Sequence, residues 1–308
     1  MLSRTLILKT SALKPVQKLI RKSFLFRPLV KRFIAGDTLE EAMGNAQALL
    51  DKGFNVSLDN LGENTSTETE ALTAKSTYIR MLDTIGLQKP EPIERCNISI
   101  KLTQCGLDLG TDYAERNYRD VLVAAQQHKN FVRVDMEASE YTARTLEIME
   151  RVLPDFTNTG TVLQSYLIRT DDDVQRMIDL KARVRLVKGA YLEPATVAYQ
   201  DKKEVDAAYV RQSKRLIAEA PYAAIATHDE KIINELNAFV AEKKIDRAGF
   251  EYQMLFGIRR DLQERLRSEG YNVRVYVPFG DSWYPYFTRR LAERPANTFF
   301  ILKSMFKG

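Results

Sequence analysis

The sequence predicts an α/β fold, a (β/α)8 TIM-like barrel with an N-terminal helical extension. Short β-branched runs alternate eight times with longer, helix-patterned polar stretches. No Pro/Gly/Ser-rich linker interrupts this series after residue 37. A chain of 308 residues is also long enough for one complete barrel. Eight β-α units in one uninterrupted series therefore favour a ring of parallel strands surrounded by helices.

The elements are expected in strict alternation after an opening helix over Thr38–Lys52. Strands are predicted where Val, Ile and aromatic residues cluster, at Asn55–Leu61, Asn97–Leu102, Phe131–Met136, Thr161–Tyr166, Val184–Lys188, Ala223–Thr227, Phe250–Met254 and Asn272–Val277. Helices are predicted between them at Ser66–Ile85, Asp112–Gln127, Glu140–Val152, Asp171–Leu180, Lys203–Glu219, Glu230–Lys243, Arg259–Glu269 and Trp283–Glu293. A doubly wound open sheet is the alternative architecture, because it also alternates strands with helices. The glycines argue against it, since no two of them have GxGxxG spacing and no GxxxxGK occurs.

Composition excludes several classes of protein. A content of 44% hydrophobic residues excludes a disordered chain, and no apolar run approaches the roughly 20 residues that cross a bilayer. Cys96 and Cys105, with two isolated histidines, assemble no zinc site. Two cysteines in so long a chain indicate a reducing, cytoplasm-like compartment.

Positive charge is concentrated at the N-terminus. Residues 1–36 carry nine Lys/Arg and no acidic residue, whereas the rest has 37 basic and 41 acidic residues. We therefore divide the chain into a basic helical arm, 1–36, and a barrel domain, 37–308. The arm fits peripheral contact with anionic lipid on the inner membrane, a solvated arm that packs on the barrel, or a cleaved organellar presequence with a mitochondrial location. The net acidic body disfavours a nucleic-acid-binding protein.

Alternate residues of barrel strands point into the interior, and here that set is charged. In the second strand Ser99 and Lys101 lie opposite the apolar side. The same parity places further residues inside: Arg133, Asp135, Arg185, Glu251, Gln253, Arg274 and Tyr276. Buried charges need partners, so these residues form either a closed salt-bridge network or a polar cavity for an anionic or zwitterionic substrate beside a cofactor.

The last strand leads into a helix with tandem arginines, Arg289 and Arg290. A guanidinium binds a carboxylate through two hydrogen bonds, so the pair is a candidate anion clamp over the barrel mouth. Arg-Arg on a helix is more often solvated surface. The nearby aromatic residues Tyr276, Tyr284 and Tyr286 strengthen the functional interpretation, because they can enclose a small apolar ring.

Seven runs, in order, give the chain a family resemblance. They are ISIKLTQCGLDL from Ile98, VRVDME from Val132, VLQSYLIRT from Val162, VRLVKGAYLEP from Val184, IATHD from Ile225, FEYQMLFGIR from Phe250 and VYVPFGDSWYPYFTRRLAERPAN from Val275. Together they resemble proline dehydrogenase, from about Asp37 to Asn297, at the size of the single-function bacterial enzyme. RLVKGAY and YFTRRLAERPAN are the most specific parts.

The resemblance implies a non-covalent FAD at the carboxyl end of the barrel. It implies that FAD-dependent hydride transfer to flavin N5 oxidises L-proline to 1-pyrroline-5-carboxylate, the first step of proline catabolism to glutamate, with a membrane quinone as electron acceptor. The implied catalytic residues are Asp135 and Arg185, with Arg185 near N5. The implied proline contacts are Lys101, Ala190, Tyr191, Leu255, Tyr276, Tyr286, Arg289 and Arg290. The implied cofactor contacts are Met136, Gln164, Arg185, Lys188, Gly189, Ala190, Thr227 and His228.

The resemblance also implies a gate, and the sequence shows one departure from the family pattern and one alternative chemistry. It implies that Glu63 pairs with Arg289 as a gate, and it leaves no metal in the reaction. Leu192 departs from the Trp or Arg common after GAY, so we give it no role. Lys101 and Lys188 on barrel strands also suit a Schiff-base aldolase, a different chemistry on the same fold.

Overall fold

The computed structural model describes residues 27–62, 64–88 and 93–293. Eight parallel strands close into a barrel in sequence order: β1 (Asn55–Asn60), β2 (Cys96–Ile100), β3 (Val132–Val134), β4 (Thr159–Gln164), β5 (Arg183–Val187), β6 (Ala223–Ala226), β7 (Phe250–Leu255) and β8 (Val273–Phe279). The barrel closes where β1 pairs with β8, from Asn55 beside Arg274 to Asn60 beside Phe279. The predicted (β/α)8 barrel is confirmed, and the open sheet is wrong.

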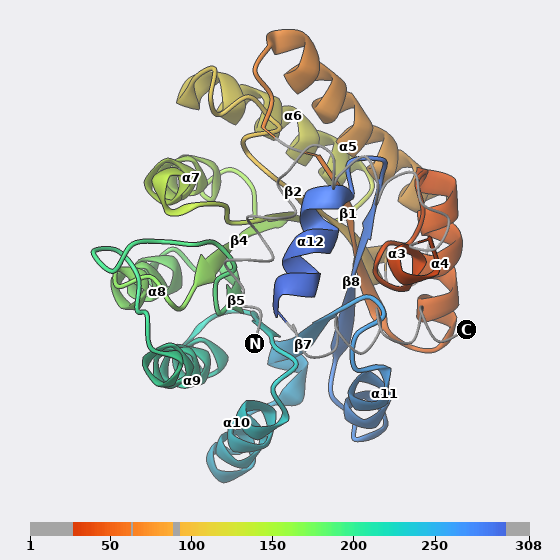
Figure 1. Ribbon diagram of the computed structural model, residues 1–308. Helices are drawn as coiled ribbons and strands as arrows, with labels where there is room; N and C mark the ends of the chain where they lie inside the picture. The colour runs from red at the N-terminus through yellow and green to blue at the C-terminus, as the bar shows by residue number, and fades with distance from the viewer. Residues whose placement is uncertain (1–26, 63, 89–92, 294–308) are drawn as a thin grey trace.

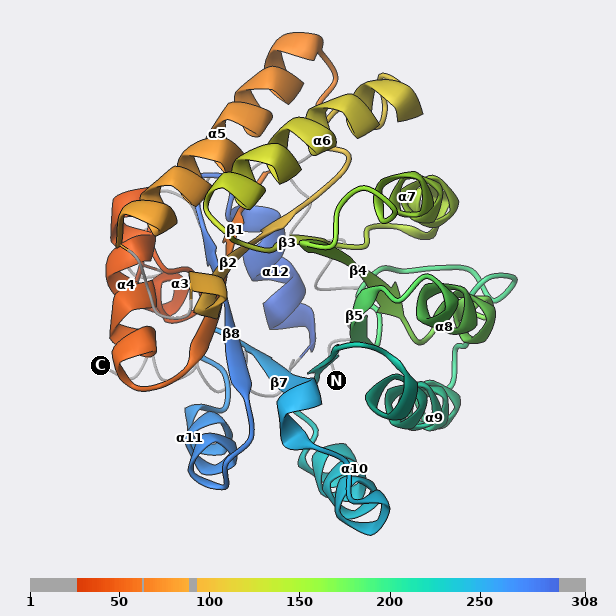
Figure 2. The same ribbon diagram turned by 180° about the vertical axis from the view of Figure 1, so that it is seen from behind.

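Helices surround the strands (Figures 1 and 2). They are α4 (Leu39–Asp51), α5 (Glu68–Gln88), α6 (Thr111–Gln127), α7 (Ser139–Val152), α8 (Thr170–Asp179), α9 (Lys202–Glu219), α10 (Glu230–Lys243) and α11 (Arg260–Ser268), with short 3-10 turns at Ile93–Arg95 and Arg247–Gly249. Side chains cap several N-termini: Thr38 accepts from the Glu41 amide, Asp201 from Lys203 and Asp229 from Lys231. No helix within the described ranges is both long and apolar enough to cross a membrane.

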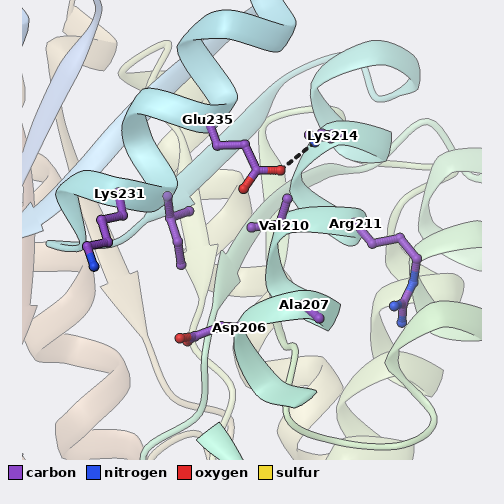
Figure 3. Close-up of a pocket in the computed structure, with 8 residues that line it drawn as sticks. Asp206, Ala207, Val210, Arg211, Lys214, Lys231 and Glu235 are labelled. Atoms are coloured by element: carbon purple, nitrogen blue, oxygen red, sulfur yellow. Dashed lines mark hydrogen bonds and ion pairs between the residues drawn. The ribbon is translucent and has the colours of Figure 1, made fainter. Parts of the chain in front are cut away.

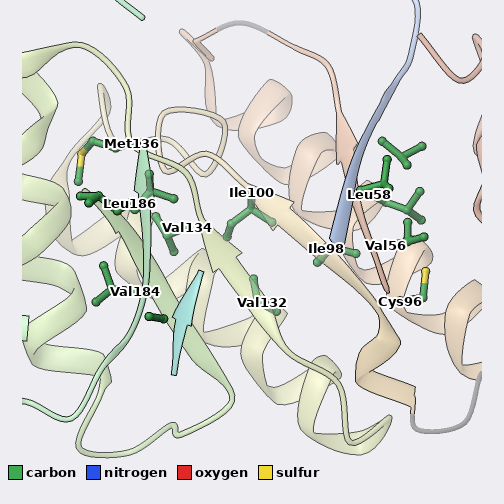
Figure 4. Close-up of a cluster of buried hydrophobic side chains, with 14 of the residues drawn as sticks. Val56, Leu58, Cys96, Ile98, Ile100, Val132, Val134, Met136, Val184 and Leu186 are labelled. Atoms are coloured by element: carbon green, nitrogen blue, oxygen red, sulfur yellow. The ribbon is translucent and has the colours of Figure 1, made fainter. Parts of the chain in front are cut away.

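The hydrophobic core lies between the strands and the helices. Alternate strand residues such as Val56, Ile98, Val132 and Val184 point outward and are fully buried there (Figure 4). This leaves the polar members of each strand to fill the barrel, as the parity of the sequence predicts.

Helix α12 (Tyr284–Glu293) lies across the carboxyl end of the barrel (Figure 1). Helix α3 (Arg27–Phe33) packs against it, with ring centroids of Phe33 and Phe287 6.3 Å apart. Val30 and Ile34 are buried in the same cluster. The Ala35 amide then donates to the Pro278 carbonyl over 2.8 Å. The last part of the basic arm therefore contacts the barrel mouth, and residues 1–26 lie outside the described ranges.

Candidate active site

Asp135, directly after β3, is the centre of a buried network at the carboxyl end of the barrel. Its Oδ1 accepts from Arg185 Nη1 over 2.5 Å, and its Oδ2 accepts from the Tyr276 hydroxyl over 2.7 Å. The three residues lie at the ends of β3, β5 and β8, and strand parity points all three side chains into the barrel. Burial raises the pKa of Tyr276 well above its ordinary value, and the Asp135 carboxylate raises it further. The tyrosine therefore stays a hydroxyl donor.

Lys101, at the end of β2, forms a second ion pair in this layer. Its Nζ lies 2.8 Å from Asp59 Oδ1, and the Asp59 side chain is 1% exposed. Burial alone would lower the pKa of Lys101, but Asp59 and Asp135 together raise it. The lysine is therefore an ammonium group, whereas a Schiff-base lysine needs a lowered pKa. This geometry disfavours the aldolase interpretation.

Two buried polar side chains in the same region, Arg185 and Gln164, each have an atom without a hydrogen-bond partner among the described residues. Arg185 Nη2 donates to Ser99 Oγ over 3.1 Å, while Arg185 Nε is buried without a hydrogen-bond partner among the described residues. Gln164 Oε1, at the end of β4, is also buried without a partner there. Buried polar groups without partners are costly, and a ligand with complementary donors and acceptors would satisfy these two, although buried atoms without partners in the described part of the chain also occur in the outer helices, for example at Gln212 and Ser213.

The loop after β5 brings Gly189, Ala190 and Tyr191 to the site. Gly189 has φ +115°, and a Cβ there would lie 2.2 Å from the Tyr166 ring, so only glycine fits. Burial raises the pKa of Tyr191, and Arg289 of α12 lies close enough to oppose this shift. The Tyr191 hydroxyl and the Arg289 guanidinium are therefore near enough to interact electrostatically, although they are far apart in sequence.

The same loop is fastened to the loop after β3. Glu193 Oε1 accepts from the Ser139 amide over 2.8 Å, and Oε2 accepts from the Ser139 hydroxyl over 2.5 Å. Ser139 is the first residue of α7, so this carboxylate caps the helix from another loop.

Lys188, at the end of β5, is held by two carboxylates. Its Nζ lies 2.5 Å from Asp206 in α9 and 3.4 Å from Asp229, the N-cap of α10. Thr227 Oγ1 accepts from the Asp229 amide over 3.1 Å. His228 Nε2 accepts from the Leu255 amide over 3.0 Å. Four of the predicted site residues therefore meet where β5, β6 and β7 end.

The remaining predicted residues divide into three groups. Tyr286 is buried in a cluster with Phe287, against which Tyr276 packs, and the Arg290 guanidinium lies 5.3 Å from the Tyr286 ring centroid. Met136 packs in the hydrophobic core (Figure 4). Glu63, with its predicted gate pairing, lies outside the described residues.

Sequence reasoning missed Asp59, Glu137, Asp206 and Glu193. Asp59 has the inward parity of Ser57 on the first strand and could have been found by the rule applied to the other strands. Glu137 shares the parity of Asp135, and it accepts from the Thr103 hydroxyl over 2.7 Å. Asp206 and Glu193 gave no such signal, because neither is on a strand.

A groove of about 600 Å³ lies on the outside of the barrel, between α9 and α10 (Figure 3). Lys214 and Glu235 bridge it over 2.6 Å. Its lining includes Asp206, the partner of Lys188, but none of the predicted site residues, and we interpret it as a groove between neighbouring helices. Among the described residues no three His, Cys, Asp or Glu side chains are grouped to hold a metal ion.

Comparison with known proteins decides the family. The family model described as proline dehydrogenase matches residues 42–303. The chain belongs to the proline dehydrogenase family. Proline dehydrogenase 1 of Bacillus subtilis (strain 168) is 40% identical over 286 residues, 93% of each chain. Proline dehydrogenase of Deinococcus radiodurans is 39% identical over 312 residues, covering 100% of this chain and 99% of its own.

The barrel of this proline dehydrogenase family member is also similar to a solved structure. Proline utilization A from Bdellovibrio bacteriovorus, inactivated by N-propargylglycine, superposes with a TM-score of 0.82 at 24% identity. The match covers 96% of this chain and 36% of that chain, and at this identity it shows the fold alone. The predicted family and the predicted oxidoreductase of proline metabolism are confirmed. The roles of individual site residues stay predictions.

Proposed function

We propose that this proline dehydrogenase binds FAD non-covalently and oxidises L-proline to 1-pyrroline-5-carboxylate, the first step of proline catabolism to glutamate. The family supports the substrate. The cofactor is supported by the buried Arg185 Nε and Gln164 Oε1, one donor and one acceptor without partners among the described residues. An isoalloxazine ring offers acceptors and a donor along one polar edge, so these groups fit it. This fit is the observation that carries the proposal.

Different residues at the barrel mouth bind the carboxylate of proline and surround its ring in this proposal. Lys101, Arg289 and Arg290 supply cations for the proline carboxylate, while Ala190, Tyr191, Leu255, Tyr276 and Tyr286 surround the ring. Asp135 holds Arg185 and Tyr276 in fixed positions, so little reorganisation is needed when substrate binds. When bound, FAD would supply the acceptor for a hydride from the ring carbon that borders the nitrogen and bears no carboxylate, and the nitrogen would release a proton to solvent as the C=N bond forms. The resulting cyclic imine hydrolyses to an open semialdehyde.

The cofactor is held mainly by the ends of β4, β5 and β6 in this proposal. Gln164, Lys188, Gly189, Thr227 and His228 lie there, with Met136 supporting from the core side. Arg185 places a positive charge where negative charge develops during flavin reduction.

The proposed electron acceptor is a membrane quinone. The protein is proposed to be cytoplasmic and to contact the membrane through its basic arm. A mitochondrial location is the alternative. Residues 1–26 hold six of the nine basic residues of the arm, and each near an anionic surface contributes about 1 kcal/mol. Removing residues 1–26 retains α3 on the barrel. The truncated protein should reduce a soluble acceptor normally and bind anionic vesicles weakly at low salt, and equal vesicle binding would contradict the membrane contact.

The direct test of the activity is spectroscopic. The purified protein should carry a yellow flavin spectrum that bleaches when L-proline is added without oxygen. D-proline at the same concentration is the matched control, since the carboxylate clamp fixes the face of the ring presented to the flavin. A colourless protein that cannot be loaded with FAD, or a flavin that L-proline leaves oxidised, would contradict the proposal.

A further inference from the structure

The guanidinium of Arg185 is held at two of its three nitrogens. Nη1 donates to Asp135 over 2.5 Å and Nη2 donates to Ser99 Oγ over 3.1 Å. Nε remains without a partner among the described residues. Asp135 alone would leave the plane of the guanidinium free to rotate about a single ion pair. The second contact, from β2, fixes that plane.

The direction of the hydrogen bonds shows how Ser99 does this. An arginine only donates, so Ser99 Oγ must accept from Arg185. The hydroxyl proton of Ser99 is then free for Ser57 Oγ, which lies 3.0 Å away. Both serines are fully buried. The serine pair is therefore a fixed acceptor beneath Arg185.

We propose that Ser99 is a positioning residue of the reaction: it orients the guanidinium of Arg185 so that Nε presents its proton to the flavin. This inference rests on the proposed function, because it requires bound FAD. Ser99 touches neither the flavin nor proline and acts through Arg185. Its loss therefore changes the electronic environment of the flavin more than the affinity for either ligand.

The test compares Ser99→Ala with Ser165→Ala. Ser165 is also fully buried, directly after β4, and its Oγ has no partner among the described residues, so it controls for truncation of a buried serine. Stopped-flow reduction at saturating L-proline should be about tenfold slower in Ser99→Ala, as expected for one lost hydrogen bond to a charged group. The sulfite affinity of the bound flavin, which reports positive charge near N5, should fall by a similar factor. Ser165→Ala should change neither.

Two measurements separate positioning from folding. In Ser99→Ala the dissociation constants for FAD and proline should stay within about threefold of wild type. Loss of a hydrogen bond made directly to either ligand would change them by more than that. Ser99→Cys keeps the volume but accepts hydrogen bonds weakly, so it should show most of the loss even if the alanine variant folds poorly.

A double-mutant cycle gives the decisive comparison. In an Arg185→Met background, Ser99→Ala should slow flavin reduction no further, because the residue through which it acts is gone. An equal slowing in both backgrounds, or identical sulfite affinities of Ser99→Ala and Ser165→Ala, would overturn the inference. A wild-type flavin that L-proline does not reduce would instead overturn the proposed function.

Discussion

The ion pair between Asp59 and Lys101 provides a quantitative test of the site. Asp59→Asn removes the charge and keeps the shape of the side chain. The two groups lie 2.8 Å apart, with side chains 1% and 14% exposed, so solvent screens the pair little. Removing one partner of such a pair typically costs about 3 kcal/mol. For a barrel of this size, that lowers Tm by roughly 5 °C.

Thermal unfolding of four proteins measures the coupling: wild type, Asp59→Asn, Lys101→Met and the double variant. Each single variant leaves one buried charge without its partner. The double variant leaves none, so it should be about 2 kcal/mol more stable than the sum of the single losses predicts. Additive losses in the four proteins would refute the pairing.

Proline kinetics in the same four proteins separate structure from binding. Lys101→Met and the double variant both lose the cation assigned to the substrate carboxylate, so both should raise KM by at least about tenfold. Asp59→Asn retains that cation and should raise KM less. A normal KM in Lys101→Met would remove the lysine from the carboxylate site.

The arginine pair, the loop contact and the lower ion pair give three further tests. Replacing Arg289 and Arg290 together by Met should lower kcat/KM for proline more than tenfold while the visible spectrum shows FAD still bound; near-normal turnover would contradict the clamp. Glu193→Gln should weaken FAD binding about twofold to fivefold in a fluorescence titration, because the Glu193 carboxylate attaches the loop that carries Gly189 to the start of α7. An unchanged FAD affinity would mean that this contact does not support the loop. Burial alone would raise the pKa of Glu251, but Arg274 lowers it to about 2 from an ordinary 4.5. This shift corresponds to about 3 kcal/mol of folding stability above pH 4.5, and that contribution is lost as pH falls toward 2. The Tm advantage of wild type over Glu251→Gln should shrink across that window, and a constant difference would contradict the assignment.

The periodicity of the sequence predicted the barrel well because each strand carries its own signal. All eight strands and the helices between them occur where expected, with shifts of up to three residues at their ends. β4 begins at Thr159, two residues before its predicted start. The prediction began at Thr161 because Gly160 interrupts the β-branched pattern. β8 runs through Pro278 to Phe279, although proline usually ends a strand. There the Pro278 carbonyl accepts from Ala35, so α3 and its loop support the extension.

The contacts between side chains were harder to predict than the side chains themselves. Parity placed Asp135 and Arg185 inside the barrel, but whether two inward residues touch depends on barrel tilt and side-chain length. Lys188 shows the limit, since its partner Asp206 lies inside a helix 18 residues away, where a carboxylate usually faces solvent. Glu193 likewise follows no periodicity. These contacts are set by how separate loops meet, and a local pattern does not encode that.

The two interpretations of the charged interior apply to different layers of the barrel. In the lower layer the Glu251 carboxylate accepts from Arg274 over 2.8 Å, from Gln253 over 2.5 Å and from Tyr222 over 3.0 Å, and Arg274 also donates to a β1 carbonyl. These contacts form an ion-pair network that links β1, β7 and β8 in the lower part of the barrel. In the upper layer Arg185 keeps a buried donor without a partner among the described residues. A ligand site needs a rigid base, and the lower ion pairs supply one because they fix the strands whose upper ends must meet the ligand.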